Sequence, residues 1–436
     1  MADETPRLGF DTLQIHAGAR PDPATGARQV PIYQTTAYVF RDADHAARLF
    51  NLQEVGYIYS RLTNPTVAAL AERVAALEGG AGAVGCASGH AAQIMALFPL
   101  MAPGRNVVAS TRLYGGTVTQ FTQTFKRFGW RAKFVDFEDE GAIRGAIDAD
   151  TRAVFCEAIT NPGGYIVDLP RVAAVAREAG VPLIVDNTSA TPFLCRPIEH
   201  GATIVVHSTT KYLTGNGTVT GGVVVDSGAF DWKASGRFPS LSEPEPAYHG
   251  TVFADAFGPM AYTFHGIAVG LRDLGMTMNP QAAHYTLMGI ETLSLRMRRH
   301  VDNAVAVARW LEADPRVERV AYAGLESSPS FERVARICPQ GAGALFTFAV
   351  RGGYDACVRL IDGVRLFSHV ANLGDTRSLI IHPASTTHRQ LSESQQRAAG
   401  ADPEVVRVSI GIEDPRDLIA DLDQALEKAT AGARAA

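Results

Sequence analysis

Residues 202–222 read ATIVVHSTTKYLTGNGTVTGG, and this stretch joins an apolar strand pattern to a lysine and a glycine-rich loop. The run from Thr203 to Val206 is β-branched and bounded by turn residues, so it predicts a buried strand. Lys211 follows closely, after small hydroxyl residues. This setting suits an amine held beside a phosphate group, although a surface lysine after a strand fits the stretch about equally well.

Similar apolar runs recur along the first part of the chain. They lie near 82–86, 106–110, 132–136, 152–157, 182–186, 203–207 and 222–226. Amphipathic helical patterns fill most of the gaps; one begins after Asn64, a good N-cap, and another covers 169–179 with Asp168 as its cap. Apolar strands that alternate with helices predict an α/β fold with a mostly parallel, seven-stranded sheet covered on both faces.

The remaining patterns divide the chain into three parts. Residues 1–60 lack sustained periodicity and predict an N-terminal arm that lies on another surface. Residues 61–275 form the predicted large α/β domain. Residues 276–436 predict a smaller α+β domain, with strand signals at 344–350, 378–381 and 405–410 and a last helix from about 415.

Composition indicates an ordinary soluble globular protein of 436 residues, with 46% hydrophobic and 19% charged residues. A formal charge of −5 gives no basic face for nucleic acid or membrane. The start, MADETPRLGFDTLQ, lacks a secretory signal, and no apolar run is long enough for a membrane span. Five scattered cysteines without a CxxC pair predict buried, reduced thiols, so we expect a cytoplasmic protein, and we expect no metal site.

Polar residues follow two further predicted strands. Ser88, Gly89 and His90 open a helix, where small residues expose backbone N–H groups to an anion; a plain N-cap explains Ser88–Gly89 equally simply. Asp186 ends the run VPLIVD, and a carboxylate there needs a donor or cation, unless it only forms a turn. The cofactor that combines an aldehyde for Lys211 with a phosphate and a ring nitrogen for Asp186 is pyridoxal phosphate.

Several separated motifs carry a resemblance to a known family. The segments TTKYLTGNGTVTGG, DNTSATP, YSRLTNPTVAALAERVAALEGG and HPASTTHRQL together resemble the Cys/Met-metabolism family of pyridoxal-phosphate enzymes. The resemblance spans essentially the whole chain and implies fold type I, the aspartate-aminotransferase-like fold. The segments LYGGT, FPSLSEPEPAYHG and LFSHVANLGDTRSLIIHPASTTH most closely resemble the O-acetylhomoserine sulfhydrylase branch.

The resemblance assigns the cofactor contacts. It implies that Lys211 bonds to the cofactor aldehyde and that Asp186 pairs with the pyridine nitrogen. The phosphate is expected to bind Ser88, the backbone of Gly89 and His90, and the hydroxyls of Ser208 and Thr210. The sulfhydrylases usually have SGQAAQ where this chain has SGHAAQ, so an imidazole at His90 would change the pocket only if its side chain enters it.

It also assigns the ring, substrate and neighbour contacts. Tyr114 is expected to stack on the ring and act as acid or base near the leaving group, and Asn161 to contact the ring oxygen. Arg407 would bind the substrate α-carboxylate, with Asn372 beside it. A packed loop tyrosine and an Asn-Pro turn are the simpler readings of Tyr114 and Asn161.

Two residues of the YSR motif, Tyr59 and Arg61, are expected to reach the phosphate of a neighbouring subunit, and Tyr59 the substrate as well. Arginine suits phosphate because its fork donates two hydrogen bonds, whereas a surface ion pair contributes only ~0–1 kcal/mol. The resemblance therefore implies at least a dimer, and usually a tetramer built from two active dimers.

The expected activity is γ-replacement on O-acetyl-L-homoserine by sulfide or methanethiol, giving homocysteine or methionine plus acetate. Cystathionine γ-synthase, O-succinylhomoserine sulfhydrylase and methionine γ-lyase share the same cofactor residues and remain open. A non-catalytic protein with this fold is a distant alternative, because a scaffold needs none of Lys211, Asp186, Tyr114 and Arg407.

Overall fold

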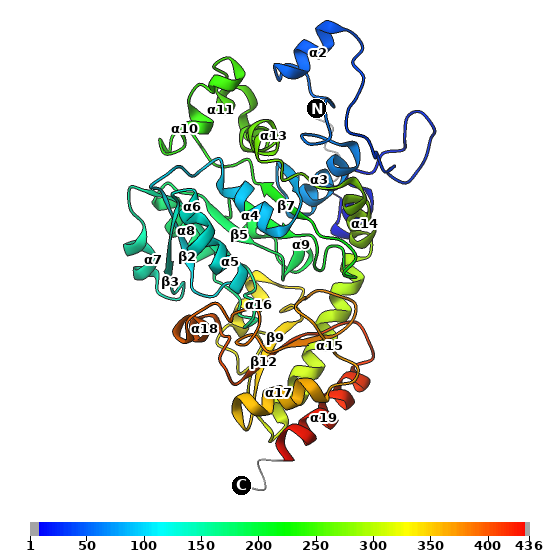
Figure 1. Cartoon of the computed structure of the whole chain (residues 1–436), viewed down its shortest axis with the longest axis vertical. Coiled ribbons are helices and arrows are strands. Elements are labelled where there is room, and N and C mark those ends of the chain that lie inside the picture. Colours follow the sequence, from blue (N-terminus) through cyan, green and yellow to red (C-terminus); the bar gives the residue numbers. More distant parts are fainter. Residues whose placement is uncertain (1–7, 432–436) are drawn as a thin grey trace. The chain divides into compact units, whose positions relative to one another are not determined.

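The computed structural model describes residues 8–431 (Figure 1). The chain separates into two compact units. The first consists of the residues up to Leu100, Thr203–Thr210 and Thr218–Ser294, and the second of Met101–Ala202, Lys211–Gly217 and the residues from Leu295 onward. The predicted domains, by contrast, are continuous segments divided at residues 60 and 275, and this division stays a prediction.

Seven strands form the larger sheet, as predicted. In the first unit β7 (Gly222–Asp226) pairs antiparallel with both β1 (Gly82–Cys86) and β6 (Ile204–Ser208). In the second unit β5 (Leu183–Asp186), β4 (Thr151–Glu157), β2 (Asn106–Ser110) and β3 (Arg131–Val135) are neighbours in that order, all parallel. The apolar runs predicted these strands to within one residue, and the sheet is mostly parallel with β7 reversed.

The second unit holds a smaller sheet of five strands. Their order is β10 (Ser368–His369), β11 (Leu379–Ile381), β12 (Val405–Ser409), β9 (Leu345–Val350) and β8 (Val317–Ala321). Only the β10–β11 pair is parallel. Every residue of β9 and β12 is buried, so Arg407 on β12 is a charged residue inside an apolar strand.

Short and long helices surround these strands (Figure 1). Those of the first unit are α1 (Phe10–His16), α2 (Ala43–Phe50), α3 (Pro65–Glu78), α4 (Gly89–Leu97), α10 (Pro239–Ser242), η3 (Pro246–Tyr248), α11 (Phe253–Phe257), η4 (Gly258–Met260), α12 (Ala261–His265), η5 (Gly266–Leu271), α13 (Arg272–Leu274) and α14 (Pro280–Ile290). Those of the second are α5 (Gly115–Thr119), η1 (Gln120–Thr124), α6 (Phe125–Arg127), α7 (Glu140–Ala146), α8 (Leu169–Glu178), α9 (Thr191–Leu194), η2 (Pro197–His200), α16 (Phe331–Ile337), α17 (Gly353–Gly363), α18 (Glu393–Ala399) and α19 (Pro415–Ala431). The helix α15 (Leu293–Ala313) begins in the first unit and continues in the second.

Two predicted helix caps have different outcomes. Asn64 caps α3 through its side chain, which accepts the N–H groups of Thr66 and Val67. Asp168 precedes α8 but makes no side-chain cap bond, because its carboxylate pairs with Arg336 at 3.0 Å instead. The position of this helix start was predicted correctly, whereas the function of Asp168 as a side-chain cap was wrong.

The described part of the N-terminal arm forms a loop of the first unit. A backbone bridge between Ala37 and Tyr59 closes a loop that contains α2. Apolar side chains on this loop face solvent, with Val39 99% and Val55 82% exposed. Such exposure is what a surface that packs on another molecule would show in a single chain; the predicted contact with a neighbour stays a prediction.

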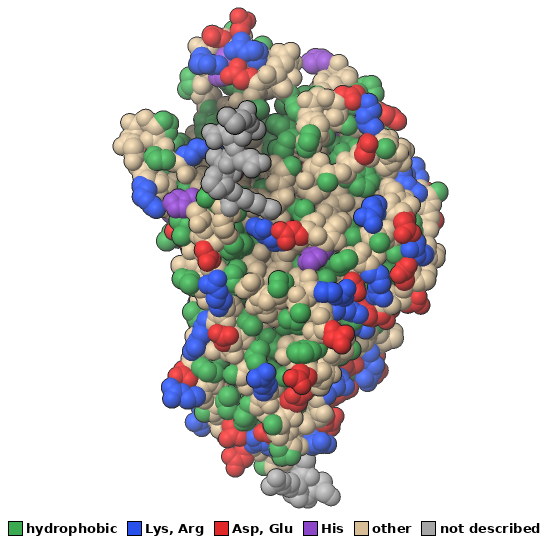
Figure 2. Space-filling model, turned by 180° about the vertical axis from the view of Figure 1, so that it is seen from behind, with side chains coloured by type: hydrophobic (Ala, Val, Ile, Leu, Met, Phe, Trp, Pro, Cys, Tyr) green, Lys and Arg blue, Asp and Glu red, His purple; other side chains and the backbone are tan. Residues whose placement is uncertain are grey.

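Charged side chains are distributed without a single-sign patch on the face drawn in Figure 2, where blue and red groups are interspersed. No helix within residues 8–431 is long and apolar enough to cross a membrane. All five cysteines are buried thiols, as their positions in apolar runs predicted.

Candidate active site

Lys211 lies in the second unit at the start of the glycine-rich loop, and its amine is held in place. The Nζ atom donates to Oδ1 of Asn372, and the main-chain carbonyl accepts the N–H of Gly215 at 2.8 Å. Burial, together with the positive charge of Arg407, lowers the pKa of Lys211 to about 8. The amine is therefore partly deprotonated near neutral pH, which an exposed lysine is not.

Arg407 bonds to two other predicted site residues, Asn161 and Asn372. Its guanidinium is 2% exposed; Nη1 donates to Oδ1 of Asn161 at 3.0 Å, and Nη2 donates to the carbonyl of Asn372 at 2.7 Å. The Nε–H group has no partner within the described chain. Burial lowers the pKa of Arg407 to about 10, so this buried cation would be stabilised by an anion.

A carboxylate that sequence reasoning missed continues this set of contacts. Glu157 ends β4, and its two oxygens accept the N–H groups of Tyr114 and Asn161, each at 2.7 Å. Hydrogen bonds thus link Tyr114, Glu157, Asn161, Arg407, Asn372 and Lys211 in sequence. The rule that singled out Asp186, a carboxylate at the end of a buried strand, would also have found Glu157.

Asp186 is the last residue of β5 and pairs in register with Glu157 on the neighbouring strand. Its Oδ1 accepts the N–H of Thr188 at 3.0 Å, which is the turn considered as its simpler reading. One carboxylate oxygen can form this bond while the other binds a further donor. The turn is therefore compatible with the predicted contact to a ring nitrogen.

His388 is a second residue near Tyr114 that the sequence did not single out. The two rings meet edge to face with centroids 6.5 Å apart. The imidazole is fully buried, and burial and then the charge of Arg407 lower its pKa to about 4. His388 is therefore neutral at physiological pH, and its place in an irregular loop left no periodic signal.

Several of the residues predicted to bind phosphate lie in the first unit, around the start of α4 or in the segment that ends at Thr210. Ser88 caps this helix, with its Oγ accepting the N–H of Ala91 at 3.1 Å. A Cβ atom at Gly89 would lie 2.7 Å from Cβ of Ser208, so only glycine allows this approach. Thr210 lies on the same unit, where its hydroxyl accepts the N–H of Gly221 at 3.1 Å.

Three more predicted residues of the first unit have exposed side chains. Tyr59 is 41% exposed, and the Arg61 guanidinium lies over its ring, 5.4 Å from the centroid. Nη1 of Arg61 donates to the carbonyl of Arg272. His90 is exposed in the first turn of α4. The expectation that His90 contributes only its backbone stays a prediction.

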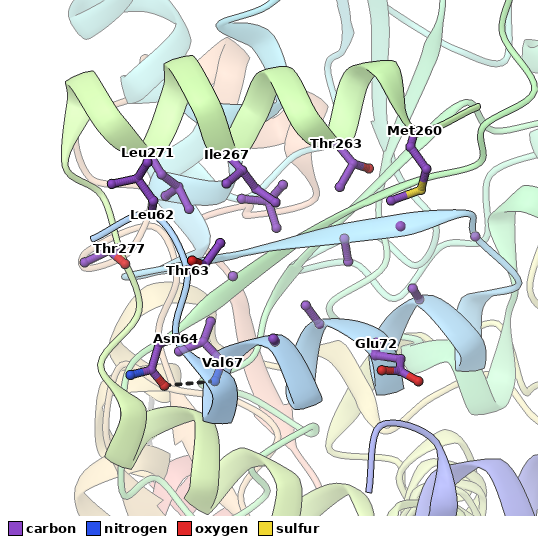
Figure 3. Close-up of a pocket in the computed structure, with 18 of the residues that line it drawn as sticks. Leu62, Thr63, Asn64, Val67, Glu72, Met260, Thr263, Ile267, Leu271 and Thr277 are labelled. Carbon is purple, nitrogen blue, oxygen red and sulfur yellow. Dashed lines mark hydrogen bonds between the residues drawn. The ribbon is translucent and has the colours of Figure 1, made fainter. Parts of the chain in front are cut away.

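A separate pocket of about 400 Å³ lies within the first unit (Figure 3). Mostly small or apolar side chains line it, including Val67 on α3 and Met260, Ile267 and Leu271 on the helices that follow residue 257. Neither Lys211 nor Asp186 is among its lining residues. This pocket is therefore not the site predicted around Lys211.

The chain is similar to known proteins over almost its whole length. Residues 11–427 match the family described as Cys/Met metabolism PLP-dependent enzyme. The chain is 50% identical to homocysteine synthase of Schizosaccharomyces pombe, over 96% of this chain and 98% of that protein. It is 49% identical to O-acetyl-L-homoserine sulfhydrylase 1 of Thermus thermophilus, over 96% of this chain and 100% of that protein.

Among solved structures, one of a putative O-acetylhomoserine (thiol)-lyase from Campylobacter jejuni matches with a TM-score of 0.93 and 40% identity. The match covers 96% of this chain and 100% of that one, which contains N′-pyridoxyl-lysine-5′-monophosphate. The predicted fold type and the pyridoxal-phosphate cofactor are thereby confirmed. The chain belongs to the Cys/Met metabolism family of pyridoxal-phosphate-dependent enzymes.

Proposed function

We propose that this enzyme catalyses γ-replacement on O-acetyl-L-homoserine, with sulfide giving L-homocysteine and acetate, or methanethiol giving L-methionine and acetate. One observation carries the proposal: Arg407, a buried cation with an unpaired Nε–H, bonds the carbonyl of the residue whose side chain holds the Lys211 amine. Arg407 and Lys211 both bond to Asn372, which supports a site where Arg407 binds the carboxylate of an α-amino acid and Lys211 acts beside it. The acetyl ester is inferred from the names of the relatives.

The residues fit pyridoxal phosphate. Lys211 is an amine with a lowered pKa, Asp186 is a carboxylate for the ring nitrogen, and Asn161 has an amide for the ring oxygen. Ser88, Gly89, His90, Ser208 and Thr210 are proposed to hold the phosphate, because the start of α4 offers N–H groups and the positive end of a helix dipole. When bound, the cofactor supplies an electron sink for negative charge beside the amino-acid nitrogen.

The protein side chains then move protons and hold groups. Lys211 takes the α-proton of the substrate and transfers a proton to and from the β-carbon, for which a pKa of about 8 is well matched. Asp186 would pair with the protonated ring nitrogen, and Tyr114 would lie on the ring and donate a proton towards the departing acetate oxygen. The γ-carbon loses its bond to oxygen and gains a bond to sulfur, and the proton transfers reverse.

Substrate orientation is proposed to depend on Arg407 and Asn372. Two hydrogen bonds from one guanidinium to the α-carboxylate fix both position and direction. Because Asn372 also accepts from Lys211, its side chain must give up that bond when the amine moves. This exchange couples substrate entry to release of the amine.

The assembly is proposed to be a tetramer of two active dimers in the cytoplasm. Tyr59 and Arg61 are exposed on the first unit. Exposure in a single chain is expected of residues that reach the phosphate of a neighbouring subunit, and Tyr59 is proposed to reach the neighbour's substrate as well. If this is correct, the variant Arg61→Ala binds pyridoxal phosphate more weakly while remaining oligomeric in sedimentation analysis. A monomeric wild-type enzyme with full activity would rule out the shared site.

A substrate panel tests the activity. O-Acetylhomoserine, O-succinylhomoserine and methionine are each supplied with sulfide, methanethiol or cysteine, and homocysteine, methionine, cystathionine and acetate are quantified. The expected result is equal release of homocysteine and acetate from O-acetylhomoserine and sulfide, with a lower kcat/KM for the succinyl ester. Cystathionine as the main product, or breakdown of methionine as the fastest reaction, would replace the proposal by one of the other family activities.

A further inference from the structure

Glu157 is a buried carboxyl group to which none of the predicted roles applies. It ends β4 in the second unit and is 5% exposed. Its strand partner in register is Asp186, so two carboxyl groups lie side by side at the carboxyl ends of adjacent parallel strands. Burying an acid next to another acid costs free energy unless hydrogen bonds offset it.

Both oxygens of Glu157 are occupied by main-chain donors. Oε1 accepts the N–H of Tyr114 and Oε2 the N–H of Asn161, each at 2.7 Å. These donors come from different loops: Tyr114 precedes α5, and Asn161 follows β4 by four residues. One side chain therefore fixes the main-chain positions of two residues that we place on the cofactor ring.

The electrostatic interactions of Glu157 indicate that it does more than support packing. Burial, and then repulsion from Asp186, raise the pKa of Glu157 well above its usual value, while the two N–H bonds oppose that rise. The charges of Glu157 and Asp186 therefore interact, and Asp186 is the carboxylate that we propose pairs with the ring nitrogen. The side chain of Asn161 extends the same link to Arg407 at 3.0 Å.

We propose that Glu157 is a positioning residue of the active site: it holds the main chains of Tyr114 and Asn161 against the cofactor ring and sets the electrostatic environment of Asp186. This inference rests on the proposed cofactor contacts of those three residues. It does not depend on which ester or sulfur donor the enzyme uses.

Glu157→Gln is the direct test, because an amide offers one acceptor and one donor where two N–H groups need two acceptors. Glu157→Asp keeps both oxygens on a shorter stem and serves if the amide variant does not fold. Asp421→Asn is the matched control: Asp421 is also buried in the second unit and accepts the N–H groups of Arg365, Leu366 and Phe367.

The readouts are the dissociation constant of pyridoxal phosphate for the apoenzyme, the absorbance maximum of the bound cofactor across pH, kcat and KM, and the unfolding midpoint of the apoenzyme. For Glu157→Gln we expect cofactor affinity and kcat to fall roughly tenfold to a hundredfold, the cost of leaving one buried N–H group without an acceptor. We also expect the absorbance titration to shift. Asp421→Asn should lower the unfolding midpoint and leave the other readouts unchanged.

Each outcome decides the inference. Equal loss of thermal stability in both variants, with wild-type cofactor affinity and absorbance, would show that Glu157 only supports the fold. If the wild-type chain bound pyridoxal phosphate but did not process O-acetylhomoserine, the cofactor readouts would still decide the role of Glu157, and only the proposed reaction would fail. A wild-type chain that binds no pyridoxal phosphate overturns both.

Discussion

Replacing Arg407 by lysine keeps the positive charge and removes the fork that we place on the substrate carboxylate. Of the five N–H groups of a guanidinium, one goes to Asn161 and one to the carbonyl of Asn372. About three therefore remain for a carboxylate, including Nε–H, which is buried without a partner in the described chain. Two charge-assisted bonds can form at once with the substrate.

The magnitude follows from this count. Each hydrogen bond to a charged group contributes about 1.5–3 kcal/mol, and a lysine amine can retain one of the two. Arg407→Lys should therefore lose about 1.5–3 kcal/mol of substrate binding, which lowers kcat/KM roughly tenfold to a hundredfold, mainly through KM. The substrate carboxyamide, which lacks the anion, should lose much less.

The assay is steady-state homocysteine formation from O-acetylhomoserine at saturating sulfide, with cofactor content determined from absorbance in each preparation. Arg299→Lys is the control, because Arg299 also donates to a main-chain carbonyl, that of Glu413 at 3.1 Å, but is exposed. A KM for Arg407→Lys within threefold of the wild-type value, with full cofactor content, would refute this role of Arg407.

Three further predictions concern the amine of Lys211, the close backbone approach at Gly374 and the buried carboxyl group of Asp226. Lys211→Ala should abolish turnover and leave the circular dichroism spectrum and apoenzyme unfolding midpoint within a few degrees of wild type; retained full activity would exclude Lys211 as the reacting amine. Gly374→Ala should lower the free energy of unfolding by about 1–2 kcal/mol from backbone strain alone, because φ at this residue is +73°. It should also weaken cofactor binding, because the new Cβ would lie 2.6 Å from the N atom of Tyr212, beside Lys211. Denaturant titration and cofactor titration measure the two effects, and unchanged values would contradict the close approach. Asp226→Asn should stabilise the enzyme at pH 8 but much less at pH 5, because burial raises the pKa of Asp226 to about 7. The stability that the protonated acid contributes is complete below about pH 4 and is lost as the pH rises through 7. The free energy of unfolding of the wild-type enzyme should change by a few kcal/mol over this range. Equal effects of that substitution on unfolding free energy at both pH values would show that Asp226 does not titrate in this way.

The sequence predicted the strands well because each is a short apolar run between turn residues. The run at 222–226 became β7, in which every residue is buried. Its antiparallel direction was not predictable, since a continuous apolar run shows burial and not strand polarity. Apolar residues continue at helical spacing from Leu287 to Trp310, but α14 ends at Ile290 and α15 begins at Leu293.

The candidate site was predictable where a charged residue interrupts or ends an apolar strand. Asp186 and Arg407 stand out in this way, because a charge inside a buried strand needs a partner. Glu157 obeys the same rule at the end of the run 152–157, and applying the rule to every strand would have found it. His388 lies in a loop far along the chain from Tyr114, and only tertiary structure brings the two rings together.

The central claim is that Lys211 is the residue that binds the cofactor, and borohydride reduction tests it most directly. The chain has only five lysines; three of them pair on the surface, Lys133 with Asp148, Lys233 with Asp255 and Lys428 with Gln424, and Lys126 is exposed. After reduction of the yellow enzyme and proteolysis, we predict that mass spectrometry finds the pyridoxyl-phosphate mass on the peptide containing Lys211 and on no other. The label on a different lysine, or no label on a protein that retains activity, would contradict the account.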